Sequence, residues 1–147
     1  MPRKTPDVIL IAVDGSKASL QAARQGFQIA KAMGASVEIV NVLVYGGSGA
    51  KGAAATYWYS ALPKLREDAR STLSQAVRDA ESAKVPFEAK VLEGHDAAVA
   101  IVQEAEEVHP RLIVVGSHGR TGIQRVLLGS VAEKVVRLAP CPVLVVR

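Results

Sequence analysis

Five short runs rich in Val, Ile and Leu recur along the chain, and stretches with helical periodicity separate them. The runs span residues 8–13, 36–44, 85–92 (with the strand after Pro86), 112–115 and 143–146. The run over 8–13 is unbroken, which is typical of a strand buried on both faces. Strands that alternate with helices predict an α/β fold in which a parallel sheet carries helices on both faces, joined by right-handed crossovers.

The stretches between the runs place apolar residues every three or four positions. This spacing predicts helices over 18–33, about 62–83, 97–108 and 131–138. Ser16 and Asp96 are the predicted N-caps, and Gly34 is the predicted C-terminal glycine of the first helix. Pro63 is expected in the first turn of its helix or at a break near it. The Gly/Ala-rich stretch over about 46–56 predicts a flexible surface loop. We expect the whole chain, 1–147, to form a single domain.

Composition narrows the classes of protein that the chain can belong to. A hydrophobic fraction of 49% and a charged fraction of 22% over 147 residues are typical of a globular domain. The single cysteine, Cys141, excludes an internal disulfide and a Cys-rich zinc site, and its place between two prolines favours a small buried side chain over a reactive thiol. The longest apolar run has six residues, far below the roughly 20 that span a bilayer. With no secretory leader in the N-terminal residues, we expect a cytoplasmic protein.

The formal charge of +4 permits anionic ligands, nucleic acid or an acidic membrane surface as partners. The basic residues are scattered over the predicted helices, and the three consecutive aromatic residues at 57–59 do not alternate with them. A nucleic-acid-binding face normally gathers its basic residues into a stripe. We therefore expect neither nucleic acid nor a membrane as the partner.

A glycine-rich segment follows the fourth apolar run. Gly116, Gly119 and the pair Gly129-Ser130 punctuate it, and Arg120 and Arg125 add positive charge. Glycines let backbone N–H groups approach a phosphate closely, and the start of a helix after Gly129-Ser130 would favour an anion. The segment favours phosphate binding, although glycines also turn a chain and S-x-x-E at Ser130 fits a capping box. It contains neither a P-loop nor a G-x-G-x-x-G dinucleotide motif.

The pattern Gly116-x2-Gly119-x9-Gly129-Ser130 resembles the nucleotide signature of the universal stress protein family. Residues 112–147 are similar to the C-terminal half of that family, and residues 9–16 (ILIAVDGS) are similar to its N-terminal strand and turn. The resemblance covers essentially the whole chain. It implies an open, twisted, five-stranded parallel sheet in the order 3-2-1-4-5, Rossmann-like and similar to the adenine nucleotide alpha hydrolases.

The resemblance to the ATP-binding branch of the family also implies which residues bind the nucleotide. Asp14 would lie by the ribose and adenine, and the backbone of Val42 would contact adenine. Mg²⁺ or Mn²⁺ would bridge the phosphates. Asn41 stands where the family commonly has His, and Pro110-Arg111 where it commonly has Asp. The implied ATP contacts are Ala12, Val13, Asp14, Val42, Gly116, Ser117, His118, Gly119, Arg120, Gly129, Ser130 and Val131.

Together these features predict an ATP-dependent stress-response or signalling protein with no assigned catalytic residue. In the sheet order that the resemblance implies, the last strand lies at an edge, and family members commonly dimerise through it. We expect a homodimer formed through Val143, Leu144, Val145 and Val146. Three alternatives stay open: slow ATP hydrolysis or phosphoryl transfer through Asp14, a dimeric module that binds no nucleotide, and Asp14 as a simple turn residue.

Overall fold

The computed structural model describes residues 6–46, 51–119 and 128–147. Five parallel strands form one sheet in the order β3-β2-β1-β4-β5, which confirms the predicted fold class and strand order. Each strand starts and ends within two residues of its predicted bounds. The strands are β1 (Val8–Ala12), β2 (Ser36–Val44), β3 (Phe87–Gly94), β4 (Leu112–Gly116) and β5 (Val143–Val146).

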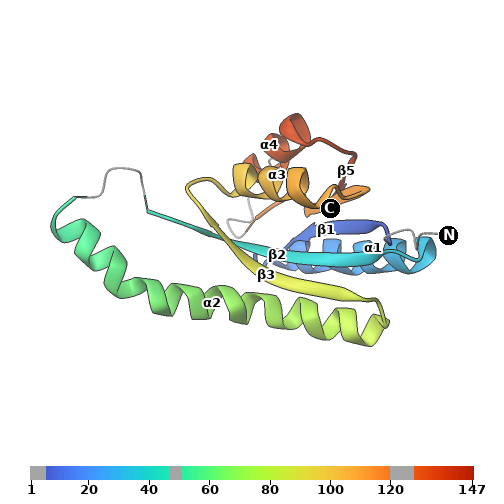
Figure 1. Ribbon diagram of the computed structural model, residues 1–147, viewed down its shortest axis with the longest axis horizontal. Helices are drawn as coiled ribbons and strands as arrows, with labels where there is room; N and C mark the ends of the chain where they lie inside the picture. The colour runs from blue at the N-terminus through green and yellow to red at the C-terminus, as the bar shows by residue number, and fades with distance from the viewer. Residues whose placement is uncertain (1–5, 47–50, 120–127) are drawn as a thin grey trace.

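Four helices cover the two faces of the sheet (Figure 1). The helices α1 (Lys17–Met33) and α2 (Ala53–Ala83) lie on one face, and α3 (Ala97–Val108) and α4 (Ser130–Leu138) lie on the other. The predicted caps of α1 and α3 are confirmed. The side chain of Ser16 accepts a hydrogen bond from the N–H of Ser19, and that of Asp96 accepts one from Val99. None of the helices in the described ranges is long and apolar enough to cross a membrane.

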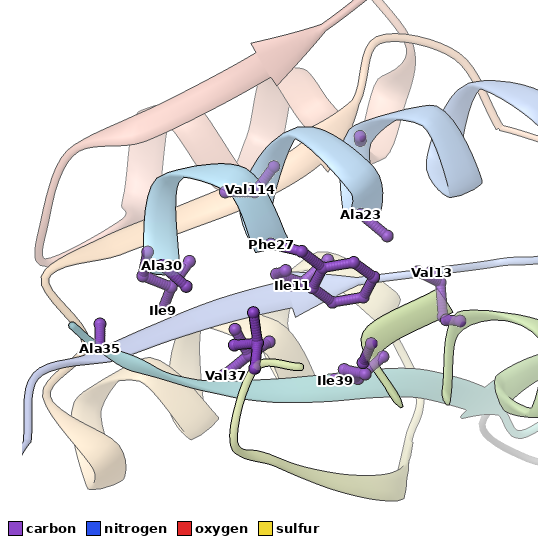
Figure 2. Close-up of a cluster of buried hydrophobic side chains, with 14 of the residues drawn as sticks. Ile9, Ile11, Val13, Ala23, Phe27, Ala30, Ala35, Val37, Ile39 and Val114 are labelled. Carbon is purple, nitrogen blue, oxygen red and sulfur yellow. The ribbon is translucent and has the colours of Figure 1, made fainter. Parts of the chain in front are cut away.

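The core consists of two hydrophobic layers, one on each face of the sheet. Successive residues of β1 alternate between them, because side chains of a strand point to opposite faces. Ile9 and Ile11 pack with Phe27 of α1 in the first layer (Figure 2). Leu10 and Ile113 pack beneath α3 and α4 in the second layer. All of these side chains are at most 2% exposed. The central strands β1 and β4 therefore lie in the middle of the hydrophobic core.

The helix α2 begins earlier than the sequence predicts. It starts at Ala53, inside the stretch expected to be a loop over 46–56, and it continues through Pro63 instead of starting near it. Its buried residues all lie in its C-terminal half. The N-terminal turns extend beyond the strands in Figure 1. Pro63 is exposed and removes one backbone N–H donor there, so the helix tolerates it at the cost of one hydrogen bond.

Contacts with the ends of two strands hold the N-terminal half of α2 in place. Arg66 donates two hydrogen bonds to the carboxylate of Glu93 in β3, at 2.7 and 3.2 Å. Tyr45, which follows β2, donates a third hydrogen bond to the same carboxylate and meets the ring of Trp58 edge-on. The Arg66 guanidinium is the main cause that lowers the pKa of Glu93 to about 2. These contacts join residues far apart in sequence, and periodicity within the helix does not predict them.

Candidate functional site

The strands β1 and β4 lie side by side where the strand order reverses, and their carboxyl ends border a cavity of about 350 Å³. Open α/β sheets generally bind ligands at this place. Every predicted site residue within the described ranges lines the cavity, whereas Arg120 lies outside those ranges. The complete lining is Ala12, Val13, Asp14, Ser19, Val42, Ala97, Ile101, Val115, Gly116, Ser117, His118, Gly119, Gly129, Ser130, Val131 and Ala132.

The lining has two chemically different parts. Val42, Ile101, Val115 and small alanines supply apolar side chains from β2, α3, β4 and neighbouring segments. The other part consists of Asp14, His118, three serines at 19, 117 and 130, and the three glycines of the glycine-rich segment. An apolar pocket with a few polar groups is the usual form of a small-molecule site. This lining suits a ligand with one flat, apolar part and one polar, charged part.

Asp14 shapes the turn that leads from β1 into α1. Its Oδ1 accepts a hydrogen bond from the N–H of Ser16 at 2.9 Å, and the following Gly15 has a φ of 82°. The N–H of Asp14 itself donates to the hydroxyl of Ser19 at 3.2 Å. The turn-forming role of Asp14 is therefore confirmed. The structure adds Ser19, only 3% exposed, to the site. The signal in the sequence was a hydroxyl residue in the first turn after the Asp-Gly turn.

Asn41, where the family commonly has His, is tied to the same turn. It is 7% exposed, and its Nδ2 donates a hydrogen bond to the carbonyl of Val13 at 2.8 Å. The N–H of Val13 in turn donates to the carbonyl of Val40. The bonds of Val13 with Asn41 and with Val40 together fix the position of Val13 at the edge of the cavity. It acts there without being part of the cavity lining.

The three glycines of the segment differ in what stands next to them. A Cβ on Gly116 would lie 3.0 Å from backbone atoms of Ala18 and Ser19 in α1, and a Cβ on Gly129 would lie 3.0 Å from the carbonyl oxygen of Ser117. Among the described residues, a Cβ on Gly119 would meet only the carboxylate of Asp14, at 3.1 Å. A side chain on Gly116 or Gly129 would therefore crowd the backbone of the chain itself. Gly119 is the glycine whose missing side chain leaves room inside the cavity.

Ser117 connects the start of the glycine-rich segment to its end and to β5 through backbone hydrogen bonds. Its N–H donates to the carbonyl of Val146 at the end of β5, and its carbonyl accepts a hydrogen bond from the N–H of Gly129 at 2.6 Å. Its hydroxyl lies 2.8 Å from Nδ1 of His118. Ser117 is only 1% exposed. The residues before and after the segment are thereby held together at the mouth of the cavity.

The helix α4 begins without a side-chain cap. Its N-cap is Gly129, with φ −67° and ψ 158°, and Ser130 is already the first helical residue. The capping-box interpretation of Ser130 is therefore wrong, because a capping residue must precede the first helical residue. The first N–H groups of a helix have no intrahelical partner. The uncapped start of α4 at the cavity therefore leaves donors for other hydrogen bonds.

Asp96 lies at the start of α3, after His95, and has structural partners. Asp96 caps α3 and accepts a hydrogen bond from Nζ of Lys134 in α4 at 2.6 Å. The Lys134 ammonium is the main cause that lowers the pKa of Asp96. Within residues 6–46, 51–119 and 128–147, no three or more His, Cys, Asp or Glu side chains gather in a way that could hold a metal ion. Asp96 thus joins α3 to α4.

The close approach of Gly116 to α1 predicts a stability effect. Gly116→Ala places a methyl group 3.0 Å from backbone atoms, so we expect the free energy of unfolding to fall by at least about 1 kcal/mol. Urea denaturation measures it. Gly94→Ala is the matched control, because its methyl group would meet only ordinary contacts at 3.5 Å or more. Equal stability of the two variants would contradict the close approach.

Comparisons with known proteins agree on one family. Residues 6–147 match the universal stress protein family. A universal stress protein of Methanocaldococcus jannaschii is 40% identical over 142 residues, which cover 95% of this chain and 81% of that protein. The solved structure of universal stress protein UspA from Lactobacillus plantarum has the same fold, with a TM-score of 0.86, 23% identity, and coverage of 99% of this chain and 100% of that one.

A third comparison concerns a structure with a bound ligand. The universal stress protein from Archaeoglobus fulgidus in complex with dAMP is 27% identical to this chain, with a TM-score of 0.74 and coverage of 98% of this chain and 100% of that one. The match to the family extends over nearly the whole chain, and the M. jannaschii relative exceeds 30% identity over most of both proteins. This chain therefore belongs to the universal stress protein family.

Proposed function

We propose that the cavity between β1, β4 and α4 binds an adenine nucleotide, ATP in the first place, and that the protein acts as a nucleotide-dependent stress-response or signalling protein. One observation carries the proposal. Segments far apart in the sequence converge on one cavity that has an apolar part and a glycine- and serine-rich part. The dAMP bound by the A. fulgidus relative supports an adenine nucleotide as the ligand.

The two parts of the lining suit the two parts of a nucleotide. The apolar side chains of Val42 and Ile101 would contact the base, whose burial contributes most of the non-directional binding energy. The carboxylate of Asp14, next to the turn, would accept hydrogen bonds from ribose hydroxyls. The phosphates would lie against Gly119 and the first N–H groups of α4, where the helix dipole favours negative charge.

A divalent ion would depend largely on the nucleotide for its ligands. Asp14 is the only carboxylate in the described lining of the cavity. Mg²⁺ commonly keeps several waters and binds through one or two carboxylates together with substrate phosphates. One carboxylate beside a phosphate site fits Mg²⁺ or Mn²⁺ in that manner. Such an ion would neutralise phosphate charge, while the chain itself positions the base and the phosphates.

Hydrolysis is expected to be slow at most. Asp14 is the one residue in the described lining with a carboxylate that could act on a bound water, and its Oδ1 is already engaged in the turn. The alternative, a hydrolase or phosphotransferase, is tested with Asp14→Asn. Asparagine can form the same turn through its own Oδ1. ATP turnover above the blank in the natural protein, lost in Asp14→Asn with ATP binding retained, would favour the enzyme.

Nucleotide binding and preference are measured together by calorimetry with ATP, ADP, AMP and cyclic AMP. We expect saturable binding of at least one of them, and ATP carried along through purification is detectable by native mass spectrometry. No binding to any of the four nucleotides would favour the alternative of a dimeric module without a nucleotide.

We also propose a homodimer formed through β5. This strand lies at the edge of the sheet and pairs only with β4 among the described strands. Its four residues are all half-buried, and Val136 and Leu138 of the preceding helix are 47% and 46% exposed. An apolar edge strand is a template for pairing with a second chain. In sedimentation at micromolar concentration we expect a species of twice 15.5 kDa; a single-chain species throughout would contradict the proposal.

A further inference from the structure

The peptide unit between Val13 and Asp14 is held from both sides at the edge of the cavity. Its carbonyl accepts a hydrogen bond from Nδ2 of Asn41 in β2 at 2.8 Å, and its N–H donates to Oγ of Ser19 in α1 at 3.2 Å. The peptide is trans and planar, so its C=O and N–H point in opposite directions. Asn41 and Ser19 therefore form a clamp, in which side chains from two elements fix the plane of one peptide.

The clamp begins where the backbone pairing of β1 ends. The strand ends at Ala12, and the N–H of Val13 still donates to the carbonyl of Val40 in β2 at 2.8 Å. Asn41 is 7% exposed and Ser19 is 3% exposed, so water competes little for their hydrogen bonds. Removing a buried partner leaves a backbone group unsatisfied, which is costly. The clamp therefore sets the direction in which the chain leaves the strand.

Ser19 also holds the turn that follows the clamped peptide. Its hydroxyl donates to the carbonyl of Ser16 at 3.0 Å, and its N–H donates to the hydroxyl of Ser16 at 3.1 Å. The N–H of Ser16 in turn donates to Oδ1 of Asp14 at 2.9 Å. The other oxygen of Asp14, Oδ2, lies 3.1 Å from the place that a Cβ on Gly119 would take, and both residues line the cavity. The clamp and the turn thus direct the Asp14 carboxylate towards the cavity.

We infer that Asn41 and Ser19 are positioning residues, which hold the Asp14 carboxylate where it selects nucleotides by their ribose hydroxyls. The inference rests on the proposed function, and it names nucleotides with intact ribose hydroxyls as the ligand class that the site prefers. A carboxylate held by buried partners accepts a hydrogen bond from a hydroxyl without first having to be ordered. Hydrogen bonds to a charged acceptor are stronger than those between neutral groups. A nucleotide without ribose hydroxyls gains nothing from this orientation.

The test compares ATP with 2′,3′-dideoxy-ATP, which lacks both ribose hydroxyls, by calorimetry. The natural protein is expected to bind ATP about tenfold more tightly than the dideoxy analogue. In Ser19→Ala and in Asn41→Leu we expect this preference to fall to about twofold or less, through weaker binding of ATP alone. Ser36→Ala is the matched control, because it removes a serine hydroxyl that lies 3.5 Å from the carbonyl of Asp7, at the opposite end of β2. It should keep the full preference.

A second readout needs no nucleotide. Hydrogen exchange at the Asp14 amide should be at least about tenfold faster in Ser19→Ala, because that amide loses its buried acceptor. The amide of Val13 bonds to the carbonyl of Val40 instead, so its exchange should stay as in the natural protein. NMR of ¹⁵N-labelled protein measures both amides. Unchanged exchange at Asp14 would mean that Ser19 does not hold the peptide, and it would overturn the inference.

The nucleotide titrations distinguish a failure of this inference from a failure of the proposed function. An equal loss of affinity for both nucleotides in the variants, or an unchanged preference for ATP, would overturn the inference and leave the proposed function intact. Equal affinities in the natural protein would also overturn it, because Asp14 would then not contact the ribose hydroxyls. Absence of binding of both nucleotides to the natural protein would contradict the proposed function itself, and the inference would fall with it.

Discussion

Gly119→Val is expected to lower the affinity for ATP by about 100-fold, or about 3 kcal/mol, while the fold is retained. The branched side chain would occupy the space between the glycine-rich segment and Asp14, where phosphates are proposed to lie. Its first carbon would stand 3.1 Å from the Asp14 carboxylate, and no backbone atom of the described residues lies within 4 Å of it. Gly119 is exposed, so the substitution removes space in the cavity without disturbing the core. Calorimetry with ATP measures the loss.

Two further variants make this result specific. Gly119→Ala introduces a single methyl group, which the side chain of Asp14 can avoid by a small rotation, and we expect a clearly smaller loss of affinity. Gly116→Ala acts on packing against α1 and is expected to change stability first. An unchanged dissociation constant for Gly119→Val, in a protein whose melting transition is also unchanged, would remove the glycine-rich segment from the binding site.

The order of elements could be predicted because each strand is rich in Val, Ile, Leu or Phe and is followed by residues that favour a turn or a helix start. Val8 to Ala12 is such a strand, and its alternate side chains enter the two core layers. The strand order itself came from the family resemblance and not from periodicity. The start of α2 was missed because alanine and glycine in the same stretch favour helix and loop respectively. The N-terminal half of α2 packs through Trp58 against Tyr45, which lies 13 positions earlier in the chain, and helical periodicity does not reveal this contact.

The sequence indicated most of the residues that line the cavity. It indicated only part of what each residue does there. The glycine spacing correctly indicated Gly116, Gly119 and Gly129 as neighbours around one cavity. It could not distinguish a glycine needed for chain packing from one that leaves room for a ligand, since that depends on the distance to another element. Ser19 and Asn41 were missed as partners of the turn because their hydrogen bonds cross between β1, β2 and α1.

A different kind of test concerns the buried charges between the sheet and α3. Glu38 of β2 is 5% exposed and Glu104 of α3 is 8% exposed, yet both carboxylates face the single ammonium of Lys90. The nearest Glu38 oxygen lies 3.3 Å from Nζ of Lys90. If all three groups are ionised, the cluster carries one uncompensated negative charge in the interior. An uncompensated buried charge is costly, so one carboxyl keeps a proton.

The proton is expected on Glu38. Burial, and next the hydrogen bond with Glu104, raise the pKa of Glu38 from its ordinary value of 4.5 to about 7. Burial acts to raise the pKa of Glu104 as well, but its hydrogen bonds with Lys90 and Glu38 lower it overall. A carboxyl with a raised pKa in the folded state contributes stability fully below pH 4.5. That contribution is lost as the pH rises through about 7.

Glu38→Gln is therefore expected to stabilise the protein at high pH. Its amide can donate to Glu104 as the protonated carboxyl does, and its oxygen can still accept from Lys90. The variant and the natural protein should have similar free energies of unfolding near pH 5, and the variant should exceed the natural protein by up to about 3 kcal/mol at pH 8. Urea denaturation at a series of pH values measures the difference between the two proteins.

The matched control for this experiment is Glu106→Gln, an exposed carboxylate on the same helix as Glu104. It removes one negative charge of the same kind from the surface, so its difference from the natural protein should change little with pH. Glu88, the strand partner of Glu38, is exposed and stays in place in all three proteins. A pH-independent difference for Glu38→Gln would mean that Glu38 holds no proton at any of these pH values. The cluster would then be a permanently ionised triad, stabilised by Lys90 alone.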